Sequence, residues 1–208
     1  QHGLMLKLFI VAVAVVALFW LYMDSLEGPV NQSNLCVLFK NHPDWYWASQ
    51  HAQEKWGVPI SLQMAIIHKE SHFRSSIRPK RELLLGFIPW EHISSARGYS
   101  QALDATWRSY LHSRHIRSAS RADFSNAVDF IGWYFADLHR VVKISYEDPL
   151  RIYLAYHEGA GGYLRGTYRH KPWLIAVARG VARQTQRYHA QLVLCQKTLP
   201  KKPWWRFW

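Results

Sequence analysis

Residues 59–73 read PISLQMAIIHKESHF, and this stretch decides the fold class. Its apolar residues recur every three or four positions, as they do along one side of a helix. Pro59 suits a helix start, because the first N–H groups of a helix have no partner within it. No stretch of the chain alternates apolar and polar residues in the way a half-buried strand does. We expect an all-α domain, with further helices at residues 43–56, 100–113, 124–144, 148–159 and 172–195.

Several of these helices carry start or stop signals. Gly57 follows the first of them in the position of a helix-ending glycine. Asp148 and Pro149 form a cap followed by a proline at the first helical position. Ser120 and Asp123 predict a capping box before the helix over residues 124–144.

Proline and glycine recur through residues 75–98, which predicts a long loop. Residues 83–90 within it are unusually apolar for a loop (LLLGFIPW). They suggest a lid over a groove or a docking patch, and packing onto the core is the alternative.

The N-terminal part predicts a membrane anchor. Residues 8–23 (LFIVAVAVVALFWLYM) carry no charge, and residues 4–6 extend the apolar run. About 20 such residues, rising ~1.5 Å each, cross a bilayer core of ~30 Å. The run ends in bulky aromatic residues, whereas a cleaved signal peptide, the alternative, ends in small ones. Lys7 precedes most of the run, so the positive-inside rule places that side in the cytoplasm and the domain outside it.

The composition fits one folded, basic domain. The 208 residues are 49% hydrophobic and 15% aromatic, which excludes a disordered chain. A formal net charge of +12 favours an anionic partner such as nucleic acid, a membrane surface or an acidic polymer. Lys7 is the first of the 26 Lys and Arg residues, and the others follow the apolar run. The anchor therefore favours lipid or cell wall over nucleic acid.

Two cysteines bracket the domain. Cys36 lies near its start and Cys195 near its end. They could form a disulfide that closes almost the whole domain, or they could be two buried thiols.

We expect four parts along the chain: an anchor at residues 4–23, a linker at 24–41, a helical domain at 42–196 and a tail at 197–208. The tail reads KTLPKKPWWRFW and interleaves basic and aromatic residues. This composition suits contact with a membrane surface or a glycan. A frayed terminus, or aromatic residues folded back over the domain, is the alternative.

Glu70 is the main candidate for chemistry. It shares one side of its helix with Ile66, Ile67 and Phe73, so its carboxylate is expected to be desolvated. Desolvation raises a carboxyl pKa toward the range that a general acid needs. A buried ion-pair partner, or a position at the rim, is the alternative.

His68 and His72 are spaced as a metal pair could be, but Glu70 does not directly follow the first histidine as the zincin pattern requires. We expect neither a metal nor a cofactor.

Two later segments complete a pattern with Glu70-Ser71. They are residues 96–101 (ARGYSQ) and residues 155–162 (AYHEGAGG). In this order, followed by a final helix, they resemble the lytic transglycosylase family of the SLT type, which is related to goose-type lysozyme. The resemblance covers roughly residues 44–195.

The resemblance implies a lysozyme-like helical domain with a glycan groove that acts on peptidoglycan. Combined with the predicted anchor, it places this domain in the periplasm, tethered to the bacterial inner membrane by one helix. Glu70 would protonate the oxygen between MurNAc and GlcNAc and then take the proton of the muramyl C6 hydroxyl. The product would be a 1,6-anhydro-MurNAc end. Tyr156 would hydrogen-bond and orient Glu70. Substrate would bind at Ser71, Gly98, Ser100, Gln101 and His157.

The chain departs from the family pattern at three positions. The usual methionine is Ser100, the usual asparagine is His157, and Glu158 is an added acid. Glu158 could be a second carboxylate, but we expect it to face solvent. A hydrolytic lysozyme on the same fold, or a non-catalytic wall-binding subunit of an envelope or secretion machine, is the alternative function.

Overall fold

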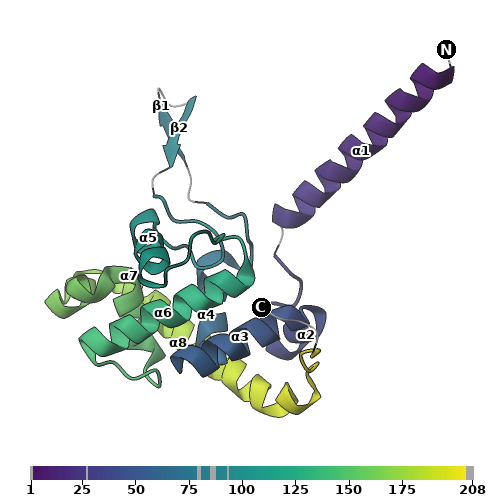
Figure 1. Ribbon diagram of the computed structural model, residues 1–208. Coiled ribbons are helices and arrows are strands. Elements are labelled where there is room, and N and C mark those ends of the chain that lie inside the picture. The colour runs from purple at the N-terminus through teal and green to yellow at the C-terminus, as the bar shows by residue number, and fades with distance from the viewer. Residues whose placement is uncertain (1, 27, 79–80, 85–87, 93, 205–208) are drawn as a thin grey trace.

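The computed structural model describes residues 2–26, 28–78, 81–84, 88–92 and 94–204 (Figure 1). For residues 2–4, 6, 8, 20–26 and both strands, it describes the backbone alone. The helices are α1 (His2–Leu26), α2 (Leu35–Asn41), α3 (Pro43–Trp56), α4 (Ile60–Ser71), α5 (Asp104–Ser113), α6 (Phe124–Val142), α7 (Pro149–Arg165) and α8 (Pro172–Cys195), with strands β1 (Arg81–Leu84) and β2 (Ile88–His92) and 3-10 turns η1 (Thr167–His170) and η2 (Gln196–Thr198).

Helix α4 lies at the centre of the helical body. Every residue from Ile60 to Ile67 is buried, and α4 packs along α8. Around this pair, α3 packs along α6, and α7 packs against both α6 and α8. The predicted helix over residues 59–73 is thus confirmed, with shorter ends: Pro59 is the N-cap, and His72 and Phe73 take left-handed φ values of 50° and 58°.

Most of the predicted helix ends are confirmed. Gly57 ends α3 with a φ of 74°. The Asp148 side chain accepts a hydrogen bond from the amide three residues later, and Pro149 begins α7. The capping box at Ser120 is wrong, because Asp123 itself is the N-cap of α6 and accepts from the Asn126 amide at 2.8 Å.

Two helices differ in extent from the prediction. Helix α5 begins at Asp104 and not at residue 100, because Gln101 has a φ of 50° that no right-handed helix accommodates. Helix α7 does not stop at Gly159: this residue forms a kink (φ 69°, ψ 164°), and the helix resumes to Arg165.

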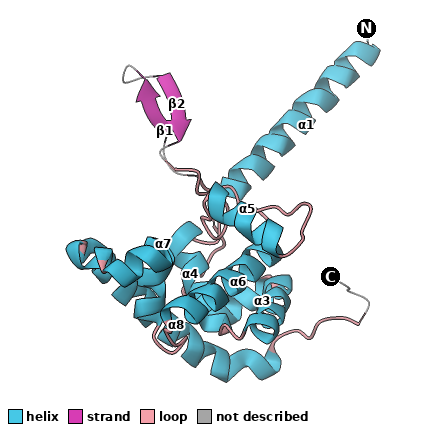
Figure 2. Ribbon diagram, turned by 60° about the vertical axis from the view of Figure 1, so that its left-hand side comes forward, coloured by secondary structure: helices cyan, strands magenta, loops and turns pink. Residues whose placement is uncertain are grey.

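The predicted loop at residues 75–98 contains an antiparallel hairpin. Strands β1 and β2 pair Leu84 with Ile88 and project from the helical body (Figures 1 and 2). Proline argued against a strand, but both strands of a two-stranded hairpin are edges, where proline is tolerated. Residues 85–87 and the side chains of both strands lie outside the described set. The three interpretations of residues 83–90, as a lid, a docking patch or part of the core, depend on them.

The expected linker at residues 24–41 includes a helix of the domain core. Leu35, Leu38 and Phe39 of α2 are fully buried. The packed domain therefore begins before residue 42.

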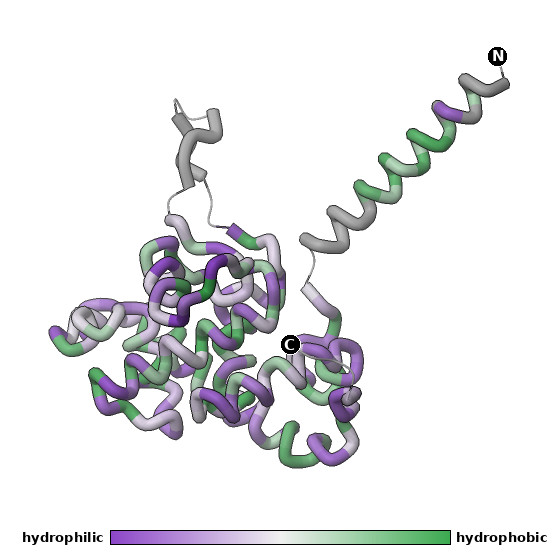
Figure 3. The backbone as a smooth tube through the Cα atoms, in the orientation of Figure 1, coloured by the Kyte–Doolittle hydropathy of each residue, from purple (hydrophilic) through white to green (hydrophobic). Residues whose placement is uncertain are grey.

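Helix α1 extends away from the helical body (Figure 1). Apolar residues run along its middle part, as the green segments of Figure 3 show, and Phe9 and Leu18 are 67% and 65% exposed. Among the residues that the structure describes, no helix combines the length and apolar character that a membrane crossing requires. The anchor at residues 4–23 stays a prediction.

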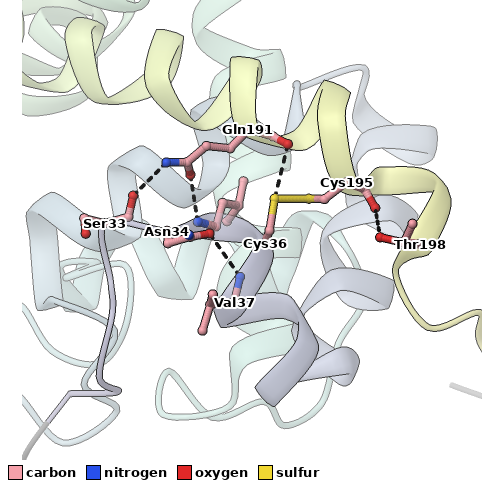
Figure 4. The surroundings of a disulfide bond; sticks show 8 residues. Ser33, Asn34, Cys36, Val37, Gln191, Cys195 and Thr198 are labelled. Atoms are coloured by element: carbon pink, nitrogen blue, oxygen red, sulfur yellow. Dashed lines mark hydrogen bonds between the residues drawn. A yellow bond between two sulfur atoms is a disulfide. The ribbon is translucent and has the colours of Figure 1, made fainter.

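A disulfide joins Cys36 to Cys195 across 159 residues, so of the two interpretations of these cysteines the disulfide is correct. Gln191 of α8 reinforces it from one turn away (Figure 4). Its amide nitrogen donates to the Ser33 carbonyl at 3.0 Å, and its amide oxygen accepts from the Leu35 amide at 2.8 Å. The start of α2 is thereby attached to the end of α8.

The tail begins by folding back onto the domain. Leu199 is 5% exposed, and the Trp47 indole N–H donates to the Pro200 carbonyl at 2.7 Å. Trp204 is 82% exposed, and residues 205–208 lie outside the described set.

Removing the disulfide should lower stability strongly. A Cys36→Ser, Cys195→Ser variant should lose about 4–5 kcal/mol in free energy of unfolding, because the cross-link constrains a long loop of the unfolded chain. Urea unfolding of the full chain measures this, and reductant should lower the wild-type midpoint without affecting the double variant. Equal midpoints with and without reductant would contradict the stabilising role.

Candidate active site

A pocket of about 430 Å³ opens where α4, α6 and α7 meet the segment that leads into α5. It is lined by Glu70, Ala96, Gln101, Ala102, Leu103, Thr106, Phe130, Tyr134, Tyr156, His157, Glu158 and Gly159.

Glu70 lies on the last turn of α4, where that helix reaches the pocket from the core. The Tyr153 hydroxyl donates to its carboxylate oxygen Oε1 at 3.0 Å. Burial raises the pKa of Glu70 to about 7, although the Tyr153 hydrogen bond and the Lys69 charge act in the opposite direction. The carboxyl group is thus able to give and take a proton near neutral pH.

Tyr153, and not Tyr156, is the tyrosine that hydrogen-bonds Glu70. The Tyr156 hydroxyl donates to the Ser100 carbonyl, so the predicted bond from Tyr156 to Glu70 is wrong. The two tyrosines are three residues apart on α7 and share one side of it. Tyr153 is 2% exposed and was not among the predicted site residues. Its spacing from Tyr156 is the sequence feature that could have indicated it.

Of the five predicted substrate-binding residues, the structure brings Gln101 and His157 to the pocket. Ser71 and Ser100 are fully buried instead. The Ser71 hydroxyl donates to the Ile67 carbonyl at 3.1 Å, within its own helix. The Ser100 hydroxyl has no hydrogen-bond partner among the described residues. Neither serine lines the groove as predicted, because both side chains point into the packed body.

Gly98 also does not line this pocket, and a tight backbone approach accounts for the glycine. Its φ is 75°, and a Cβ there would lie 2.1 Å from the Arg121 carbonyl oxygen. Arg121 is itself 6% exposed, and its guanidinium donates to the Ala102 carbonyl at 2.7 Å and pairs with Asp104. This buried arginine shapes the segment that carries Gln101.

Gln101 is held within that segment by its own amide. Its Nε2 donates to the Gly98 carbonyl at 2.8 Å and to the Ile77 carbonyl at 3.1 Å. The side chain therefore links the two chain segments that flank the hairpin while it lines the pocket.

Glu158 does not face solvent, contrary to expectation. Its side chain is 4% exposed, and the Lys171 ammonium lies 2.8 and 3.0 Å from its two oxygens. The Thr167 hydroxyl and the His157 ring also contact the carboxylate. The Lys171 hydrogen bond, followed by the Thr167 one, lowers the pKa of Glu158 to about 2. The pocket therefore contains one carboxyl that is readily protonated and one that stays ionised.

The family model for the transglycosylase SLT domain matches residues 5–195. This range contains every residue that lines the pocket. A comparison with curated proteins found no match.

Replacing Tyr153 should shift the titration of Glu70. Wild-type stability, measured against Glu70→Gln, should fall as the pH rises from 4.5 to about 7, because a raised carboxyl pKa stabilises the fold only while the group is protonated. Tyr153→Phe should raise the pH at which this loss of stability is complete by about one unit, because it removes a hydrogen-bond donor to the ionised carboxylate. Urea unfolding across pH 4–9 measures it.

Tyr156→Phe is the matched control for this shift. It removes a hydroxyl that donates to a backbone carbonyl and not to Glu70, so the titration should move much less. Equal shifts in the two variants would contradict the role assigned to Tyr153.

Proposed function

This chain belongs to the SLT transglycosylase family of peptidoglycan-cleaving lyases, and we propose that Glu70 is its catalytic acid and base and that its product ends in 1,6-anhydro-MurNAc. The observation that carries the proposal is the Glu70 carboxyl itself. It lies in the pocket with a pKa of about 7 and is oriented by Tyr153.

The proposed reaction uses one carboxyl group twice, first as acid and then as base. Protonated Glu70 gives its proton to the oxygen between MurNAc C1 and GlcNAc, and the C1–O bond breaks with the electron pair leaving on that oxygen. The ionised carboxylate then takes the proton of the muramyl C6 hydroxyl as O6 bonds to C1. A bond is broken and a bond is formed, no water is consumed, and Glu70 ends protonated as it began. A pKa near the working pH suits a group with both tasks.

The state of Glu158 supports this ring closure over hydrolysis. An inverting hydrolase needs a second carboxylate that activates water, and a retaining one needs it as nucleophile. Glu158 also lines the pocket, but its ion pair with Lys171 and its pKa of about 2 make it a weak base toward water. Lys171 also donates to both of its oxygens, so neither is free to attack C1 as a nucleophile. The C6 hydroxyl, delivered within the substrate, needs no second protein carboxylate.

Glu70→Gln should lower the rate at which purified sacculi are lysed by about 10²–10⁴-fold, because the amide neither gives nor takes the proton. Binding to sacculi should persist, since the shape of the pocket is kept. Mass analysis of the soluble muropeptides released by the wild-type chain should show anhydro ends.

The matched control is Glu54→Gln, which changes an exposed carboxylate on α3. It should leave lysis unchanged. Equal lysis by wild type and Glu70→Gln would remove Glu70 from the reaction, and reducing ends in place of anhydro ends would identify a hydrolase.

We also propose that α1 anchors the domain in the inner membrane with the pocket on the periplasmic side. Support comes from the uncharged run at residues 8–23 and from the exposed apolar side chains along α1. The basic tail is a candidate second contact with that membrane. The disulfide attaches the end of α8 beside α2, so the tail begins next to the first helix that follows α1 in the chain. A partnership with an envelope or secretion machine stays a prediction.

The location is tested by fractionating a Gram-negative cell that expresses the full chain. The chain should remain in the membrane fraction after a high-salt wash, because apolar burial of α1 is insensitive to salt. Protease added to spheroplasts should digest the domain. Release into the soluble periplasm would instead indicate a cleaved signal peptide, and protection from protease would place the domain in the cytoplasm.

A further inference from the structure

The rim of the pocket continues beyond His157 to a tryptophan on α8. Trp173 follows Pro172 in the first turn of α8, and its ring lies edge-on to the His157 ring, with centroids 5.4 Å apart at 77°. His157 lines the pocket, whereas Trp173 does not and is 56% exposed. An exposed indole is thus contiguous with the pocket without being part of its wall.

The Glu158 carboxylate contacts residues on both elements that carry these rings. One of its oxygens lies 3.0 Å from His157 Nδ1, and the same carboxylate binds Lys171, two residues before Trp173. Both rings are therefore attached to one buried anion, the histidine directly and the tryptophan through the start of α8. Support of this kind keeps the two rings at neighbouring positions, as a preorganised binding site requires.

A second exposed apolar side chain lies in the pocket wall itself. Leu103 lines the pocket and is 48% exposed. Exposed apolar side chains thus lie both in the pocket wall, at Leu103, and beside it, at Trp173.

We propose that Trp173 is a sugar-stacking platform, which binds a hexosamine ring of the glycan strand next to the ring that reacts at Glu70. This inference rests on the proposed function for the identity of the strand. The C–H bonds on one face of a β-linked pyranose match the electron-rich face of an indole, and its hydroxyls remain free for hydrogen bonds. The exposed His157 ring borders the platform. Glu158 is a positioning residue in this arrangement and takes no part in bond cleavage.

Trp173→Ala should raise KM for sacculi about tenfold and leave kcat within about threefold, because it removes stacking at a ring that does not react. Trp173→Phe should have a KM close to that of the wild type, because a phenyl ring also stacks on a sugar. Glu158→Gln should raise KM in the same direction, since it weakens the ion pair with Lys171 and frees both rings.

Binding is measured separately from cleavage with the soluble probe tetra-N-acetylchitotetraose. In the full-length Glu70→Gln chain, calorimetry should show Kd about tenfold higher when Trp173→Ala is added. The matched control is Leu194→Ala, which removes an 84% exposed apolar side chain from the far end of the same helix, about 30 Å along its axis. It should leave Kd and KM unchanged. Thermal unfolding of each variant checks its fold.

The outcomes separate the platform from the proposed function. If the chain cleaves sacculi through Glu70 and Trp173→Ala changes neither KM nor Kd, the platform is wrong and the proposed function stands. If Glu70→Gln lyses sacculi like wild type while Trp173→Ala still weakens binding, the platform stands and the catalytic role of Glu70 fails. If Trp173→Ala weakens binding and Trp173→Phe binds no better than Trp173→Ala, the platform is also overturned.

Discussion

The burial of α4 is the constraint on which the rest of the site depends. This helix is enclosed from Ile60 to Ile67, so its last turn reaches the pocket with no freedom to move relative to the core. Glu70 inherits that fixed position, and the same enclosure desolvates its carboxyl and raises its pKa to about 7. Position and proton affinity thus both follow from packing: the buried α4 carries Glu70 to the pocket, and the surrounding elements, including α7 with Tyr153, enclose its carboxyl.

The second carboxylate of the pocket shows how local partners reverse this effect. The Glu158 side chain is only 4% exposed, but desolvation has a smaller influence on it than its partners have, because Lys171 and Thr167 supply hydrogen-bond donors that lower its pKa. Glu70 has a tyrosine hydroxyl in place of a cation, and desolvation prevails. The division of tasks between the two carboxylates is therefore set by what contacts each of them: one exchanges protons and the other holds the structure around it.

The sequence predicted what depends on neighbours along the chain. Helix α3 ends before Gly57 and α7 begins after Asp148, as expected, because a cap acts within one turn. Glu70, Gln101 and His157 were correctly expected near one another. Spacing alone could not tell which of two tyrosines on one side of α7 reaches Glu70, nor that Lys171 approaches Glu158, because both contacts depend on how α7 packs against α4 and α8. The inward orientation of Ser71 and Ser100 and the pairing of β1 with β2 likewise depend on distant segments.

The disulfide has a mechanical consequence. Because Cys36 and Cys195 are covalently joined, the helices between them form a closed loop with one point of attachment. Tension applied between the N-terminal and C-terminal segments passes from sulfur to sulfur and does not stretch α3 through α8. A wall-cutting domain tethered at this one corner can be pulled without its groove being distorted, and the fold that holds Glu70 is isolated from load on either end of the chain.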